Sequence, residues 1–129
     1  MKKTEFFSCG HCRSVVQVIQ GPEGASYSCC GKPMERLVAG ATEGAAEKHL
    51  PVVEKNGNQV RIQVGSMLHP MTEEHSIGWV YLETRQGGQL SYLEPGMKPQ
   101  AVFSVAEGDA PVAAYAWCNL HGFWKTEIQ

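Results

Sequence analysis

The segment NGNQVRIQV, residues 56–64, decides the fold class of most of this 129-residue chain. Asn56-Gly57 is a strong hairpin-turn signal, and residues 59–64 alternate polar and apolar side chains with the period of a half-buried strand. A second strand is expected in which Ile77, Trp79 and Tyr81 share one face, and further strands are expected at 89–93, 101–105, 112–118 and 123–128. Helix is expected for at most a turn or two, near residues 45–48. About seven short strands separated by turns predict a β-sandwich.

The cysteines divide the chain unequally, because four of the five lie within the first 30 residues. We therefore expect an N-terminal unit at residues 1–37 and a larger unit at 38–129, with a small-residue-rich linker at 38–46. A unit of about 37 residues is too small for a core alone to stabilise, so a metal held by four thiolates would supply the missing free energy. The fold is expected to be all-β, with a small metal-stabilised N-terminal β domain and a seven-stranded sandwich.

The first candidate metal site is formed by Cys9, Cys12, Cys29 and Cys30. Cys9-Gly10-His11-Cys12 is a C-x2-C knuckle, in which a short loop lets two sulfurs grip one ion. Adjacent side chains on a strand point to opposite faces, so Cys29 and Cys30 can share an ion only through a local twist, which Gly31 permits. Four sulfurs suit zinc and iron equally, and a disulfide between the adjacent cysteines is the weaker alternative.

Composition excludes several classes of function. With 11 Lys and Arg against 13 Asp and Glu, the net charge is −2 and the basic excess of a nucleic-acid-binding protein is missing. No apolar run approaches the roughly 18 residues of a membrane span, and residues 1–9 lack the apolar core of a signal peptide. We therefore expect a cytoplasmic protein that binds neither nucleic acid nor membrane. Disulfides are disfavoured in that compartment, which favours metal binding by the cysteines.

The second candidate site lies in the larger unit, where four histidines accompany the remaining cysteine: His49, His69, His75, His121 and Cys118. All five are expected at turns or strand ends, and the Cys118-x2-His121 pair can chelate one ion from a single loop. Five candidate ligands exceed the four of structural zinc. One thiolate with several imidazoles suits a redox metal, iron or copper.

A blue-copper site is the main alternative to an iron site, because it also occurs in β-sandwiches and uses one cysteine and two histidines. That site would require a Met or Gln shortly after His121, and it would leave two histidines unused. Iron with four imidazoles and one thiolate keeps one position open, which is typical of a reacting metal. Glu47 and Lys48 directly precede His49, so the lysine could attract small anions and the carboxylate could cap the oxidised metal.

These motifs resemble the desulfoferrodoxin family, the two-iron superoxide reductases, over essentially the whole chain. The resemblance implies a desulforedoxin-like iron domain at residues 1–37 and an immunoglobulin-like catalytic sandwich at 38–129, with a second iron. This sequence differs mildly from the family at Leu50, where family members often have Val. It rests on Cys9-x2-Cys12, Cys29-Cys30-Gly31-Lys32-Pro33-Met34, Glu47-Lys48-His49-Leu50-Pro51, His69-Pro70-Met71, His75-x3-Trp79 and Cys118-Asn119-Leu120-His121-Gly122.

The resemblance also implies a function, the one-electron reduction of superoxide to hydrogen peroxide in defence against oxidative stress. It implies that Lys48 steers superoxide to the open face, that Glu47 binds the ferric iron, and that rubredoxin or a similar carrier returns the electron. It further implies a homodimer. The residues alone leave two alternatives open: a small iron or copper electron-transfer protein without a substrate, and a zinc-stabilised binding module with incidental histidines.

Overall fold

The computed structural model describes residues 4–40 and 44–129. The chain divides into two compact units, residues 1–38 and 39–129, and each is described by itself. This division falls one residue after the boundary expected from the cysteines, and the middle of the expected linker, residues 41–43, lies outside the described residues. Within the described part of the chain, no helix is long and apolar enough to cross a bilayer.

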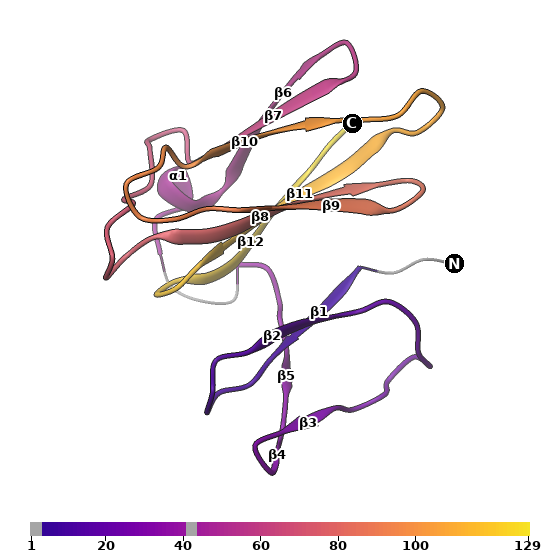
Figure 1. The fold of residues 1–129 in the computed structure, drawn as a ribbon, viewed down its shortest axis with the longest axis vertical. Helices are drawn as coiled ribbons and strands as arrows, with labels where there is room; N and C mark the ends of the chain where they lie inside the picture. The colour runs from indigo at the N-terminus through magenta and orange to yellow at the C-terminus, as the bar shows by residue number, and fades with distance from the viewer. Residues whose placement is uncertain (1–3, 41–43) are drawn as a thin grey trace. The chain divides into compact units, whose positions relative to one another are not determined.

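The first unit is built from five short strands (Figure 1). Strand β1 (Glu5–Ser8) lies between β2 (Val15–Val18) and β5 (Glu35–Arg36) in a three-stranded antiparallel sheet, and β3 (Ser28–Cys29) pairs with β4 (Lys32–Pro33). The β-branched residues Val15, Val16 and Val18 lie in β2, as suits a strand. The sequence analysis did not predict β1, whose Phe6 and Phe7 are both buried and carry no alternation.

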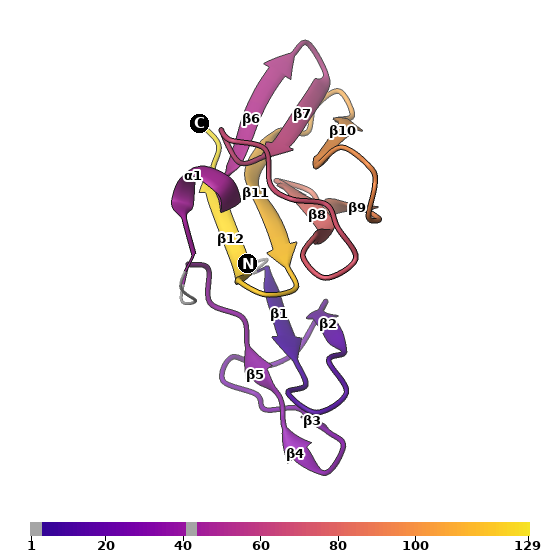
Figure 2. The same ribbon diagram turned by 90° about the vertical axis from the view of Figure 1, so that its left-hand side faces the viewer.

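The second unit contains a four-residue helix and seven strands arranged in two antiparallel sheets (Figures 1 and 2). One sheet has the order β10-β7-β6 and the other has the order β12-β11-β8-β9. The predicted all-β fold with a seven-stranded sandwich is confirmed. The elements are α1 (Ala46–His49), β6 (Pro51–Asn56), β7 (Gln59–Val64), β8 (Ile77–Thr84), β9 (Gly88–Tyr92), β10 (Gln100–Ser104), β11 (Pro111–Cys118) and β12 (Gly122–Glu127).

The hairpin of β6 and β7 forms as its sequence predicts. Asn56 pairs with Gln59, which leaves a two-residue loop in which Gly57 takes a φ of +62° that an L side chain would strain. Along β7 the apolar residues Val60, Ile62 and Val64 are at most 2% exposed, whereas the intervening residues reach solvent. The alternation therefore places one face of β7 in the core between the two sheets.

Strand β8 departs from its prediction at Gly78. Trp117 pairs with Trp79 while Cys118 pairs with Ile77, so Gly78 is an extra residue, a β-bulge, in the ladder between β8 and β11. The bulge turns Ile77 onto the core face, whereas Trp79 stacks on Trp117 on the other face, with ring centroids 6.2 Å apart. The expectation that Ile77 shares a face with Trp79 and Tyr81 was wrong, because period-2 alternation does not survive a bulge.

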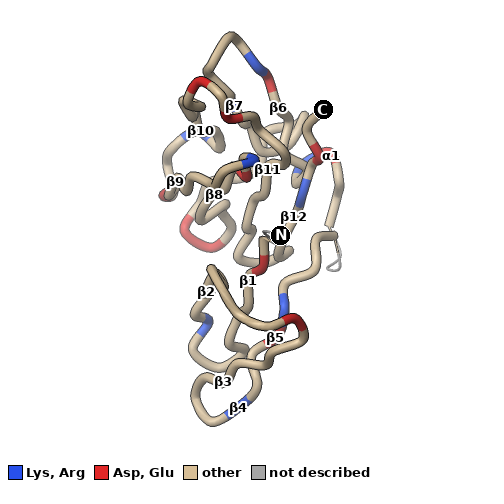
Figure 3. Tube along the Cα trace, turned by 90° about the vertical axis from the view of Figure 1, so that its right-hand side faces the viewer, with Lys and Arg blue, Asp and Glu red and all other residues tan. Residues whose placement is uncertain are grey.

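Charged residues of both signs are interspersed along both units (Figure 3). This mixed distribution agrees with the small net charge of −2.

The assigned core predicts that two leucines of the same sheet contribute very different amounts to the free energy of unfolding. Leu82 of β8 is fully buried, whereas Leu90 of β9 is 45% exposed. We expect Leu82→Ala to lower the free energy of unfolding by about 2–5 kcal/mol, because it removes buried methyl groups and leaves a cavity. Leu90→Ala serves as the control and should cost less than about 1 kcal/mol. Denaturant unfolding of both variants measures the difference, and equal losses would contradict the assigned core.

Candidate metal centres

Five donor side chains of the second unit converge where strands end. His49 is the last residue of α1, His69 and His75 lie in the connection between β7 and β8, and Cys118 ends β11. His121 lies in the turn between β11 and β12. One donor atom from each of the five lies within 4.8 Å of the others. The structure thus brings together all five predicted ligands of the second centre.

Hydrogen bonds to backbone carbonyls fix the protonation of two of these imidazoles. The Nδ1 of His49 lies 2.7 Å from the carbonyl oxygen of Ala45, and the Nδ1 of His69 lies 2.6 Å from that of Pro70. A carbonyl only accepts, so both Nδ1 atoms carry the proton and both Nε2 atoms present lone pairs. These two Nε2 atoms face each other at 3.2 Å. Two acceptors at that distance cannot hydrogen-bond each other, but they can bind one cation.

The other two imidazoles, of His121 and His75, also have nitrogens placed where they could bind the same cation. The Nδ1 of His121 lies 3.0 Å from the Nε2 of His49, and the buried Nε2 of His75 has no hydrogen-bond partner among the described residues. Metal–nitrogen bonds of about 2.1 Å at right angles place neighbouring nitrogens about 3.0 Å apart. The observed separations of 3.0 Å and 3.2 Å therefore fit a shared metal ion.

The four rings form a square rather than a tetrahedron. Centroids of neighbouring rings are 4.6–5.0 Å apart around the cycle His49, His69, His75, His121. The rings of His49 and His75 are 6.4 Å apart, close to the diagonal of a square with that side. A tetrahedral zinc site would make all such distances similar. A square of four imidazoles instead suits a metal with octahedral or square-pyramidal coordination, and it leaves no histidine over, unlike a blue-copper site.

Cys118 supplies the fifth donor from inside the sandwich. Its side chain is fully buried and its sulfur lies 3.8 Å from the Nδ1 of His121. Burial raises the pKa of this thiol, whereas hydrogen bonds from the backbone N–H groups of His121 and Leu120 lower it. A cation beside the sulfur would favour the thiolate in the same direction as these N–H groups.

The surroundings of His69 and His75 favour their ligating, neutral form. Burial lowers the pKa of His69 to about 4, and the charges of the other histidines act in the same direction. Burial is also the main cause that lowers the pKa of His75, with smaller effects from His121, His49 and Lys48. A neutral ring nitrogen is the form that binds a metal.

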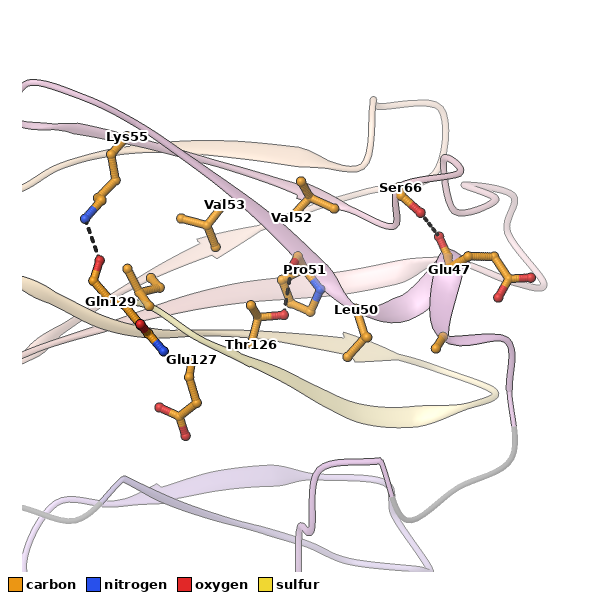
Figure 4. Close-up of a pocket in the computed structure, with 12 residues that line it drawn as sticks. Glu47, Leu50, Pro51, Val52, Val53, Lys55, Ser66, Thr126, Glu127 and Gln129 are labelled. Atoms are coloured by element: carbon orange, nitrogen blue, oxygen red, sulfur yellow. Dashed lines mark hydrogen bonds between the residues drawn. The ribbon is translucent and has the colours of Figure 1, made fainter.

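The helix that carries Glu47 and Lys48 is fastened to the connection after β7. The carbonyl of Glu47 accepts from the N–H of Met67 at 2.9 Å and from the Oγ of Ser66 at 3.2 Å (Figure 4). A Cβ on Gly65, whose φ is +76°, would overlap the carbonyl of Met67 and lie 2.7 Å from that of Glu47. Glycine is therefore required for this close approach, while the side chains of Glu47 and Lys48 remain exposed.

A surface groove of about 560 Å³ runs beside the same helix, between β6 and β12 (Figure 4). Its described lining includes Glu47, Leu50, Val52 and Thr126 but none of the five converging donors. The five converging donors therefore form a site separate from this groove.

The four cysteines of the first unit also converge, with one sulfur from each within 4.8 Å of the others. Cys12 and Cys29 have sulfurs 3.6 Å apart, and Cys29 and Cys30 have sulfurs 3.9 Å apart. Metal–sulfur bonds of about 2.3 Å give tetrahedral edges of about 3.8 Å, so both distances fit one ion. Both clusters, the four cysteines and the four histidines with Cys118, could hold iron.

A left-handed turn resolves how two adjacent cysteines reach one ion. Cys29 pairs with Lys32, which leaves Cys30 and Gly31 as a two-residue loop with φ values of +54° and +72°. Strand β3 ends at Cys29, so the two side chains no longer alternate across a strand. A left-handed L residue costs about 1–2 kcal/mol, which metal binding would offset.

The sulfurs of this cluster perturb one another in the absence of a cation. Hydrogen bonds from the hydroxyl and backbone of Ser14 lower the pKa of Cys12 to about 6. The neighbouring sulfur of Cys12 is in turn the largest cause that raises the pKa of Cys29 to about 12. A cation between the four sulfurs would favour the thiolate form of all of them.

Sequence reasoning missed the groups that support the ligands. The carbonyls of Ala45 and Pro70 orient two imidazoles, and backbone atoms carry no sequence signal. Ser14 lies 3.1 Å from the Cys12 sulfur, and its place two residues after the knuckle could have suggested this contact. Trp124 contacts two ligands, and only its proximity to His121 in the sequence hinted at that position.

Comparisons with known proteins agree with this geometry. The family model described as Desulfoferrodoxin matches residues 41–127. A protein called desulfoferrodoxin from Nitratidesulfovibrio vulgaris is 41% identical over 123 residues, which cover 95% of each chain. The crystal structure of superoxide reductase from Treponema pallidum has a TM-score of 0.83 and 37% identity, and the match covers 98% of this chain and 100% of that one. A one-iron superoxide reductase from Giardia intestinalis matches 64% of this chain and 98% of its own, with a TM-score of 0.56 and 35% identity.

The turn at Cys30 predicts unequal effects of two glycine substitutions in the cysteine loops. Gly31 has a φ of +72° and Gly10 does not lie in the left-handed region, although a Cβ at either would meet open space. We expect Gly31→Ala to weaken metal binding by about tenfold, because the strain of about 1–2 kcal/mol opposes closure of the sulfur cluster. Gly10→Ala is the control and should bind nearly as the wild type does. Competition with a chromophoric chelator measures both, and equal affinities would contradict the strained turn.

Proposed function

The chain belongs to the desulfoferrodoxin family, and from that membership together with the geometry of its donors we propose that it is a superoxide reductase. The observation that carries the proposal is the square of four imidazoles beside the buried Cys118. This donor set accounts for five positions of a six-coordinate metal and leaves one for a small ligand. The relatives from Treponema pallidum and Giardia intestinalis that share the fold are both named superoxide reductases.

Iron bound by His49, His69, His75, His121 and Cys118 would supply the single electron that converts superoxide, with two protons, to hydrogen peroxide. The role of the protein is to hold the donor atoms in place and to set the electrostatic environment around them. The Cys118 thiolate is kept dry by burial and accepts backbone hydrogen bonds, and so it can push electron density towards the metal, as thiolates do in haem enzymes. In this reaction the two protons must be delivered without cleavage of the O–O bond, so that hydrogen peroxide is released.

Lys48 would attract the anionic substrate. Its side chain is exposed, and its positive charge contributes to the lowered pKa of both His49 and His75. That influence, together with the position of Lys48 directly before His49, supports a role in steering superoxide. Lys48 could also supply or relay a proton to the departing peroxide.

Glu47 would occupy the open position of the oxidised metal until an electron arrives. The carbonyl of this residue accepts hydrogen bonds from Ser66 and Met67, while its side chain is exposed. Its charge also acts on the adjacent ligand His49. A tethered carboxylate competes with external anions for the metal, which protects the resting site.

The remaining assignments rest on family membership. We propose that residues 1–37 form a desulforedoxin-like domain with iron on Cys9, Cys12, Cys29 and Cys30, and that residues 38–129 form the catalytic domain. Rubredoxin or a similar small carrier would return the electron, and the chain would act as a homodimer in the cytoplasm. The sulfur distances of 3.6 Å and 3.9 Å support the first of these assignments.

A product count tests the proposal. A reductase consumes one superoxide for each hydrogen peroxide and makes no dioxygen, whereas dismutation yields one peroxide and one dioxygen from two superoxides. We expect the iron-loaded protein with an electron donor to give the first ratio, measured by peroxide assay and an oxygen electrode. Failure to oxidise the iron with superoxide would instead favour an electron-transfer protein without a substrate.

Removing the charge of Lys48 should slow the encounter with superoxide. We expect Lys48→Ala to lower the second-order rate constant by about tenfold and to flatten its dependence on ionic strength, because electrostatic steering is lost. Lys55→Ala is the matched control, since Lys55 is exposed on β6 and bonds to the carbonyl of Gln129 at 2.8 Å. Pulse radiolysis measures both rates. Equal rates for the two variants would remove Lys48 from the mechanism.

Removing the carboxylate of Glu47 should open the oxidised metal to anions. We expect Glu47→Ala to bind azide about tenfold more tightly than the wild type, because no tethered carboxylate competes for the position. Glu54→Ala, at an exposed position of β6, provides the control. Azide titration followed by visible absorption measures the affinities, and an unchanged Glu47→Ala would contradict the capping role.

A further inference from the structure

We propose that Trp124 is a positioning residue that holds two metal ligands, His49 and His121, with one side chain. The proposal rests on the proposed iron site but not on its reaction with superoxide. Trp124 lies on β12 and is 6% exposed. It pairs with Ala116 of β11, which belongs to the core, so the indole lies on the core side of the sheet.

The first contact is a stack on His49. The indole and imidazole rings are 4.8 Å apart with an interplanar angle of 22°. The bond from Nδ1 of His49 to the carbonyl of Ala45 fixes one edge of the imidazole, and the indole face limits its remaining tilt. An imidazole bound to a cation carries extra positive charge, which the indole face attracts. This contact is therefore stronger when the metal is bound.

The second contact is a hydrogen bond to His121. The Nε1–H of Trp124 donates to the carbonyl oxygen of His121 at 2.9 Å. This bond closes the turn between β11 and β12, and Gly122, the first residue of β12, takes a φ of +77°. Cys118 ends β11 directly before the turn, and its sulfur accepts the N–H of His121 at 3.4 Å. The indole N–H thus sets the position of a turn that holds His121 and adjoins Cys118.

Together these contacts connect ligands that are 72 residues apart in the chain. Groups that orient metal ligands change metal affinity by about 10–100-fold when they are removed. The two contacts can be partly separated, because Trp124→Phe keeps a smaller aromatic face while it loses the N–H donor. Trp124→Leu loses both.

A purely structural role for Trp124 predicts a different outcome, which Phe123 tests. Phe123 is the preceding residue of β12 and is 7% exposed. Its ring faces the other side of the sheet, where it stacks on Tyr115 with centroids 5.3 Å apart. Phe123→Leu therefore removes a comparable aromatic side chain from the same strand without touching the ligands through the indole contacts.

The experiment compares the iron-loaded full-length wild type with W124F, W124L and F123L. Loss of the Cys118-to-iron charge-transfer band during challenge with excess chelator gives the rate of iron release, and denaturant unfolding of the metal-free proteins gives stability. We expect W124L to release iron about tenfold faster than the wild type and W124F to lie between them. F123L should release iron within about twofold of the wild-type rate even where its stability loss equals that of W124L.

Release from W124L at the wild-type rate, or release from F123L as fast as from W124L, would overturn the proposal. If W124L does not fold, W124F decides, because the lost N–H bond must shift the charge-transfer band and speed release. A wild type that retains iron but does not reduce superoxide would refute the proposed function alone. A wild type whose histidines retain no iron would overturn both.

Discussion

The arrangement of the second unit depends on one constraint: imidazole nitrogens without protons face one another, and their lone pairs repel unless they share a cation. Backbone carbonyls commit His49 and His69 to tautomers whose lone pairs face each other at 3.2 Å, and His75 adds a buried nitrogen with no partner among the described residues. Such an arrangement is unfavourable without a cation, since buried acceptors lose their hydration and gain no donor. The sandwich holds these side chains in place because the connections between its strands end at the same point.

The two clusters solve the problem of gathering like donors by different means. In the first unit the backbone is locally strained, because Cys30 lies in a left-handed turn. The hydrophobic core of this unit is small, so metal binding would be the main stabilising contribution. In the second unit an extensive core positions the donors, and the supports are backbone carbonyls and one indole ring. Loss of metal should therefore loosen the first unit more than the second.

Much of this architecture was predictable because its signals are local. The hairpin at residues 56–59, the alternation along β7 and the C-x2-C knuckle each need only neighbouring residues, and all formed as predicted. Convergence of the histidines was predicted from residue types and resemblance, whereas the square arrangement required coordinates. The bulge at Gly78 and the turn at Cys30 could not be derived, because both arise where pairing between strands overrides the pattern of the chain. The supports from Ala45 and Pro70 are backbone groups, which every sequence supplies equally.

The spacing of the donors along the chain also dictates an order of assembly. All four sulfurs of the first cluster lie within residues 9–30, so they can capture an ion while the ribosome is still making the rest of the protein. The second cluster needs His121, which must meet His49 across 72 residues of chain. Its loop closure can follow only after the strands between them have paired. The cysteine cluster can therefore close within one short segment of chain, whereas the histidine cluster depends on the paired strands of the sandwich.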